Sequence, residues 1–149
     1  ATLYTDYAVD LTGFIGLKAN GSADQDGEAA DINEPLSIVA AGRSIACGVG
    51  LTDGQTYCWY VDADDLPATG IVEMDGFDAD ICWLDNQGHV GCIRNRPEAA
   101  TSGFDPATQE FTQISTGDEH ACALTDDGRA LCWPQNGRAE TSIPTLPAP

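Results

Sequence analysis

Basic residues are scarce in this 149-residue chain, where 6 Lys and Arg stand against 24 Asp and Glu and the formal net charge is -18. Such a surface repels phosphates and anionic lipid headgroups, which argues against nucleic acid and membrane-surface partners. Long hydrophobic runs are also absent. Residues 38–51 form the best candidate, but they include Arg43 and fall short of the roughly 20 apolar residues that cross a bilayer. The chain begins at Ala1 instead of Met, so we expect a processed, mature form.

Residues that typically carry catalysis are equally few. His89 and His120 are the only histidines, and neither lies beside a nucleophile in the sequence. We interpret His120 as a structural hydrogen-bonding residue and His89 as a solvent-facing residue beside a turn. We therefore predict a non-enzymatic protein without a cofactor. A secreted hydrolase is the least favoured alternative, since the many acidic residues leave paired carboxylates available.

Six cysteines fall into three sequential pairs, with ten, nine and nine residues between the two members of each pair. None forms a CxxC motif, which argues against a zinc ribbon or a thioredoxin-like site. An even number with regular local spacing favours disulfide bonds and an oxidising compartment. We therefore expect a secreted or cell-surface protein. The alternative is a cytosolic protein with six buried, reduced thiols.

The cysteine pairs mark an internal repeat. Each unit has a short apolar strand, a strand with the first Cys, a turn that ends in Gly, and a return strand with the second Cys. We divide one domain into a degenerate repeat at 1–35, repeats at 36–70, 71–110 and 111–144, and a Pro-rich tail at 145–149. The equivalent turn glycines are Gly21, Gly54, Gly88 and Gly128. Helical periodicity is lacking, so the sequence predicts an all-β fold of short antiparallel strands.

The turn of the last repeat indicates which cysteines pair. A three-residue loop over 126–128 places Gly128 at the left-handed position of a G1 bulge. Counting outward brings Cys122 opposite Cys132 as a non-hydrogen-bonded pair, with Cα atoms about 4.5 Å apart and within disulfide reach. Equivalent loops at 86–88 and 51–54 give the other two hairpins. The predicted bonds are Cys47–Cys58, Cys82–Cys92 and Cys122–Cys132.

The first repeat lacks both cysteines. Its residues 13–23 align without a gap with residues 120–130 of the last repeat. In this alignment Ile15 replaces the first Cys, and Gln25 follows at the place of the second.

The last repeat resembles a known family. It reads Gly117-Asp118-Glu119-His120-Ala121-Cys122-Ala123-Leu124, followed by Asp127-Gly128 and Cys132-Trp133. This is similar to the regulator-of-chromosome-condensation repeat, in the cysteine-bearing version of secreted bacterial proteins, with its G-x-x-H-x-C-A-L, D-G and C-W-G elements. The resemblance implies β-propeller blades, about seven in that family, whereas this chain has four copies at most. Tyr60 and Pro134 replace the Gly after Trp, and Ile93 replaces the Trp itself. The nucleotide-exchange activity of particular family members is not carried over.

One acidic segment is a candidate calcium site. Asp24, Asp26, Glu28 and Asp31 supply alternating oxygen ligands around a Gly, which suits a hard cation. The full EF-hand pattern is missing. A solvated acidic loop is therefore the favoured interpretation, and calcium is the alternative.

Asn20 begins an Asn-Gly-Ser glycosylation sequon. Asn-Gly is also a preferred two-residue hairpin turn, which is the favoured interpretation. Both can hold on an exposed turn.

Two classes of function remain. The first is a structural, self-assembling surface or fibre subunit, because a blade buries its apolar face only against its neighbours. The second is a secreted binding module, such as an adhesin, a lectin-like propeller or a protein inhibitor, with a glycan or protein ligand. Expected partners are thus further copies of the chain or an extracellular ligand.

Overall fold

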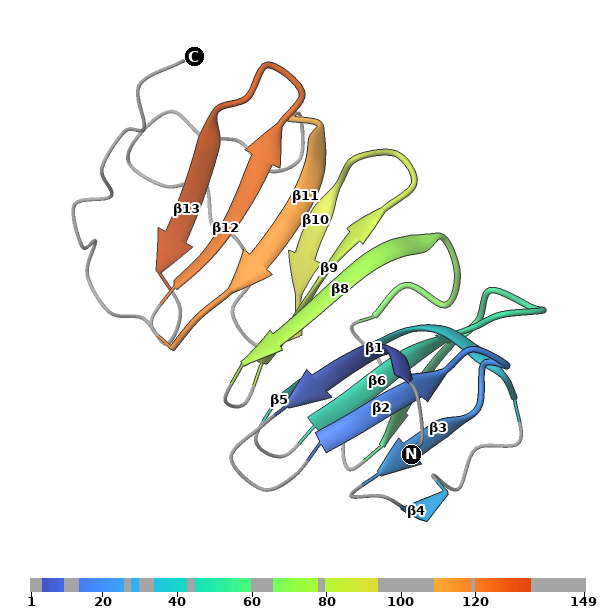
Figure 1. Ribbon diagram of the computed structural model, residues 1–149. Coiled ribbons are helices and arrows are strands. Elements are labelled where there is room, and N and C mark those ends of the chain that lie inside the picture. The colour runs from blue at the N-terminus through green and yellow to red at the C-terminus, as the bar shows by residue number, and fades with distance from the viewer. Residues whose placement is uncertain are drawn as a thin grey trace.

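The computed structural model describes residues 4–9, 14–25, 28–29, 34–42, 45–59, 66–77, 80–93, 109–118 and 120–134. These residues form thirteen strands in four antiparallel sheets that follow one another along the chain (Figure 1). The all-β prediction is confirmed. In this part of the chain, no helix is long and apolar enough to cross a membrane.

Each sheet is formed by strands that are consecutive in the sequence. The first sheet contains β1 (Tyr4–Val9), β2 (Phe14–Lys18), β3 (Ala23–Gln25) and β4 (Glu28–Ala29). The second contains β5 (Leu36–Gly42), β6 (Ile45–Gly50) and β7 (Thr56–Trp59). The third contains β8 (Ile71–Phe77), β9 (Asp80–Asp85) and β10 (Val90–Cys92). The fourth contains β11 (Phe111–Thr116), β12 (His120–Thr125) and β13 (Ala130–Pro134).

The hairpin turns set the strand register as the sequence predicts. In the last sheet the Thr125 amide donates to the Arg129 carbonyl at 2.9 Å, and the Gly128 amide donates back to the Thr125 carbonyl at 3.0 Å. Gly128 has a φ of 82°, in the left-handed region that a side chain rarely adopts. The other three turn glycines share this conformation. They are Gly21, Gly54 and Gly88.

The three local disulfide bonds are confirmed. Cys47–Cys58, Cys82–Cys92 and Cys122–Cys132 each join facing residues of neighbouring strands, with Cα atoms 4.1, 4.0 and 3.9 Å apart. In the first sheet, Ile15 and Gln25 face each other at the equivalent position. The four sheets are therefore copies of one hairpin design, and the first lacks the covalent link.

The hydrophobic core consists of three clusters, one between each pair of successive sheets. Between the first and second sheets lie Ile15, Leu17, Ala23, Leu36, Val39, Ala41 and Ala46. Between the second and third lie Ala40, Ile45, Cys47, Val49, Ile71, Met74, Ile81 and Ile93. Between the third and fourth lie Cys82, Leu84, Val90, Cys92, Phe111, Ile114, Ala121, Ala123 and Trp133. The first strands β1, β5, β8 and β11 contact one another in this order, so they share one side of the assembly.

Candidate functional site

A pocket of about 320 Å³ lies where the first strands of the four sheets converge. We call it the axial pocket. Its lining comes from all four strands: Tyr7 and Ala8 of β1, residues 39–41 of β5, residues 73–76 of β8, and Ile114 of β11. Because every sheet contributes, the pocket exists only when the sheets are packed in order.

Small residues let β5 and β8 approach closely beside this pocket. A Cβ atom at Gly76 would lie 2.6 Å from the Ala41 carbonyl oxygen, which is closer than real contacts allow. Backbone cannot move aside as the end of a flexible side chain can. Glycine is therefore required at this position by the packing of the two sheets.

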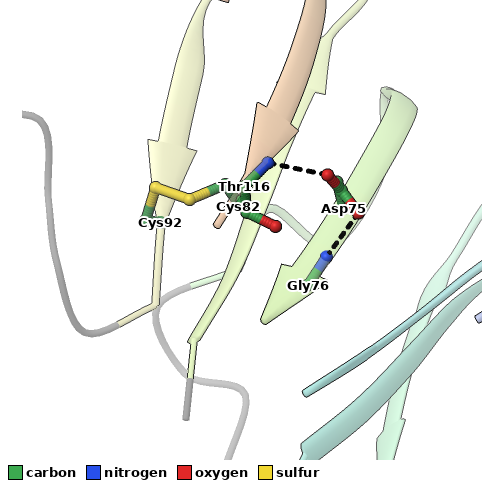
Figure 2. The surroundings of a disulfide bond; sticks show 5 residues. All are labelled: Asp75, Gly76, Cys82, Cys92 and Thr116. Carbon is green, nitrogen blue, oxygen red and sulfur yellow. Dashed lines mark hydrogen bonds between the residues drawn. A yellow bond between two sulfur atoms is a disulfide. The ribbon is translucent and has the colours of Figure 1, made fainter. Parts of the chain in front are cut away.

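Two carboxylates of β8 reach the edge of β11. Asp75 Oδ2 accepts a hydrogen bond from the Thr116 amide at 2.7 Å, and its Oδ1 accepts one from the Gly76 amide at 2.9 Å (Figure 2). Glu73 Oε2 accepts from the Ile114 amide at 3.2 Å. The carboxylates thus satisfy amides that the β11–β12 ladder does not use.

Glu73 is electrostatically perturbed. Partial burial raises the pKa of its carboxyl above the ordinary value of 4.5, the hydrogen bond from the Ile114 amide opposes this rise, and the charge of Asp75 adds to it. The ionised form of Glu73 is therefore less favourable here than in water. A positive charge beside it would stabilise that form.

The axial pocket offers binding chemistry. Its polar side chains are Tyr7, Glu73 and Asp75, and the rest of its lining is small or apolar. A carboxylate pair can hold an ammonium or guanidinium group by charge-assisted hydrogen bonds. Among the residues that the structure describes, the lining includes neither a nucleophile–base pair nor a histidine. The non-enzymatic prediction stays a prediction.

The two histidines lie outside this pocket. His89 is exposed, with Nδ1 3.2 Å from Asp85 Oδ2. Burial alone would raise the pKa of Asp85, but hydrogen bonds from the His89 and Gln87 amides and from the His89 ring lower it. The side chain of His120 is exposed, and its carbonyl accepts from the Gly117 amide at 2.8 Å. His89 is thus solvent-facing as predicted, whereas a structural role for the His120 ring stays a prediction.

Asn20 lies on the exposed turn between β2 and β3. Its Oδ1 accepts hydrogen bonds from the Ser22 amide at 3.1 Å and from Ser22 Oγ at 2.8 Å. The turn interpretation is consistent with this geometry, and glycosylation stays a prediction.

The acidic segment is described only in part. Asp24 is buried, and its Oδ1 lies 2.6 Å from Lys18 Nζ, so an ammonium group already compensates its charge. Glu28 begins β4, and Asp26 and Asp31 lie outside the described residues. Calcium at these four positions stays a prediction.

The sequence prediction of the site did not include Glu73, Asp75 or Gly76. The sequence did contain a signal for the two carboxylates. In the aligned strands, Glu73 and Asp75 stand where β5 has Ile38 and Ala40, and this face is buried between sheets. Charged residues at such positions indicate a specific partner.

Solved structures similar to this chain include two receptor ectodomains and a yeast protein. The ectodomain of the receptor kinase CR4 from Physcomitrella patens has a TM-score of 0.71 at 20% identity, covering 95% of this chain and 42% of that one. The CRINKLY WD40 ectodomain of the receptor kinase ACR4 from Arabidopsis thaliana has 0.61 at 18%, covering 96% and 51%. Prp20p from Saccharomyces cerevisiae, reported with its binding to Gsp1p and histones, has 0.63 at 15%, covering 88% and 44%. The chain thus spans about half the length of these structures or less.

These likenesses concern the fold, and they define a protein of the β-propeller type, built from successive antiparallel sheets. Residues 111–137 match the regulator of chromosome condensation (RCC1) repeat family, which confirms the resemblance for the last repeat. No curated protein matches the chain in sequence.

Proposed function

We propose that this chain is an extracellular binding module that takes a cationic segment of a protein partner at the axial pocket. One observation carries the proposal: Glu73 and Asp75 line a concave site at which all four sheets converge. Binding residues presented by a rigid β scaffold are a common arrangement in proteins of this architecture.

Charge favours a cationic partner. The net charge of -18 attracts basic proteins over a distance and speeds their encounter with the chain. Because burial raises the pKa of Glu73, an arginine or lysine side chain in the pocket gains from stabilising the ionised carboxylate. A glycan ligand, as in a lectin-like propeller, has no comparable support.

The extracellular location rests on two features. Three disulfide bonds with no free cysteine in the described residues suit an oxidising compartment. Two of the similar structures are receptor ectodomains. Both features support secretion or display at the cell surface.

The test is calorimetric titration with a hexa-arginine peptide. The double variant Glu73→Gln, Asp75→Asn keeps a carbonyl acceptor at both positions but removes two charges from the pocket. We expect it to weaken binding by about tenfold or more, as for the loss of charge-assisted hydrogen bonds.

The matched control is Glu110→Gln, Asp118→Asn, which removes two exposed charges outside the pocket lining. We expect it to change affinity by less than about twofold. Equal losses in both double variants would mean that only the overall charge attracts the peptide, and the pocket would then have no role.

A self-assembling surface or fibre subunit is the second candidate function. It is favoured by the exposure of Tyr7, an aromatic side chain 70% exposed on the first strand. Contact with another copy would bury the large apolar surface of this side chain.

A further inference from the structure

Successive sheets in the described residues pack through the same two faces. In the second, third and fourth sheets one face carries the disulfide bond. We call this face, and the equivalent face of the first sheet, the disulfide face. The opposite face, which we call the receiving face, presents one residue at the middle of the first strand. Cys47 of the second sheet shares a cluster with Met74 of the third, and Cys82 of the third shares one with Ile114 of the fourth.

The fourth sheet has an open disulfide face. Cys122 and Cys132 are half-buried, whereas Cys82 and Cys92 of the third sheet are 0% exposed. The burial of the earlier bond comes from the sheet that follows it. In the described part of the chain, no sheet follows the fourth.

The first sheet has an open receiving face. Tyr7 pairs with Gly16 as Ile114 pairs with Ala123, and the alignment of residues 13–23 with 120–130 makes these pairs equivalent. Ile114 is 3% exposed and its counterpart Met74 is 7% exposed, but Tyr7 is 70% exposed. A position that is buried in the following sheets is thus open in the first.

We propose that a second copy of the chain covers both faces, head to tail. The disulfide face of the fourth sheet in each copy packs on the receiving face of the first sheet in the other copy. Two identical contacts form, and they close a ring of two copies with four sheets each. This proposal does not depend on cation binding, although Tyr7 of the receiving face also lines the axial pocket with Glu73 and Asp75.

Two observations favour a second copy as the occupant. The contact continues an interface that the chain already forms three times between its own sheets. In addition, the chain covers 51% and 44% of two similar propeller chains, so two copies supply about the length of one such chain. A closed ring is the arrangement that uses both open faces.

The strand register supplies the polar part of the contact. Gln113 pairs with Leu124 as Glu73 pairs with Leu84, and Ser115 pairs with Cys122 as Asp75 pairs with Cys82. Gln113 and Ser115 are both exposed. Gln113 and Ser115 therefore occupy the positions on β11 that Glu73 and Asp75 occupy on β8. From those positions on β8, the side chains accept hydrogen bonds from backbone amides in the first strand of the next sheet. In the ring Gln113 and Ser115 accept the amides of Tyr7 and Val9 of the second copy.

Light scattering coupled to size exclusion, on the full oxidised chain, tests the ring. We expect a single species with twice the 15.6 kDa mass of one chain. Tyr7→Lys and Ser115→Arg each place a charge in one open face, and each is expected to give a folded single chain. Leu51→Lys, at a turn residue 56% exposed outside both faces, is the control and should keep the doubled mass.

Mixing the two variants tests the head-to-tail geometry. Tyr7→Lys keeps a native disulfide face and Ser115→Arg keeps a native receiving face, so an equimolar mixture should recover the doubled mass through one contact. A variant that stays dimeric alone, or a mixture that stays monomeric, would overturn the head-to-tail contact. Wild-type species that grow with concentration would show an open filament and overturn the ring. A wild-type single chain at high concentration would overturn the proposal and leave further repeats of a longer chain as the occupant.

Discussion

Two sheet-to-sheet contacts of similar geometry are held together by different chemistry. The middle joint, between the second and third sheets, is apolar, with Ala40, Ile45 and Met74 in its cluster and Gly76 against the Ala41 carbonyl. The last joint, between the third and fourth sheets, also has an apolar cluster but adds carboxylates that accept amides of β11.

The difference between the joints shows which side chains one register position of the first strand can accommodate. At the same position of the first strand, β5 has Ala40 facing Cys47, and β8 has Asp75 facing Cys82. Either a small apolar side chain or a hydrogen-bonded carboxylate can fill the space between sheets. A charged acceptor is worth about 1.5–3 kcal/mol per bond, but only while its donor stays in place. The last joint therefore depends more strongly on geometry than the middle joint.

Removal of a disulfide bond should give the largest loss of unfolding free energy, and the loss should differ between the two joints. The bonds Cys47–Cys58 and Cys82–Cys92 have sequence separations of 11 and 10, so loop closure contributes about 3 kcal/mol in each case. Cys82 and Cys92 are both fully buried, whereas Cys58 is half-buried. Replacing both members by Ala should therefore cost about 4 kcal/mol at Cys82–Cys92, because a cavity adds to the entropy term.

The comparison is measured by urea unfolding at a fixed chain concentration, since self-association shifts apparent stability. The Cys47–Cys58 double variant should lose about 3 kcal/mol. The Cys122–Cys132 double variant, with half-buried cysteines, is the control for a bond outside both joints. If that control loses as much as Cys82–Cys92, burial in the last joint contributes nothing.

Gly76→Ala should break the middle joint. The new Cβ atom meets the Ala41 carbonyl oxygen at 2.6 Å, so β5 and β8 must move apart at a cost of about 3 kcal/mol. Gly117→Ala is the matched control, because its nearest contact would be an ordinary 3.5 Å. Thermal and urea unfolding measure both variants. Equal stability of the two variants would contradict the close approach of the strands.

Asp75→Ala should weaken the last joint. The substitution leaves the amides of Thr116 and Gly76 without their carboxylate acceptor, and the expected loss is about 2 kcal/mol. Asp75→Asn retains one carbonyl oxygen and should lose about half as much. Asp126→Ala, which removes an exposed carboxylate at a turn, is the control. Equal losses for Ala and Asn at position 75 would mean that the hydrogen bonds do not hold the joint.

The sequence predicts the hairpins because their information is local. A turn glycine fixes the loop, and counting outward from it brings Cys122 opposite Cys132, as the structure confirms. Local periodicity and turn chemistry are sufficient for these features.

The axial pocket could not be predicted in the same way. Its carboxylates bind amides 41 residues further along the chain, and this contact depends on how closely successive sheets pack. No local pattern encodes that distance. The exposure of Tyr7 is equally invisible in the sequence, because its strand alternates as the other first strands do.

Glu73→Gln should give the smallest effect, and its sign depends on pH. Because the folded pKa of Glu73 lies above 4.5, the folded chain binds this proton more tightly than the unfolded chain does. The wild type therefore loses stability as the pH rises from about 4.5 through the folded pKa. The variant lacks this loss, so its stability relative to the wild type should rise over that window and then stay level. Glu73 is only partly buried, so solvent screens its charge and the rise should be only about 0.5 kcal/mol or less.

Asp127→Asn supplies a control of opposite sign. A hydrogen bond from the Thr125 hydroxyl, helped by Arg129 and opposed by slight desolvation, lowers the pKa of Asp127. The wild-type carboxylate thus adds stability above its unfolded pKa, and this variant should lose stability relative to the wild type as the pH rises. Urea unfolding in steps between about pH 3 and about pH 7 measures both differences. If the two differences have the same slope, titration at position 73 reflects the overall charge of the chain, and the last joint holds no perturbed carboxyl.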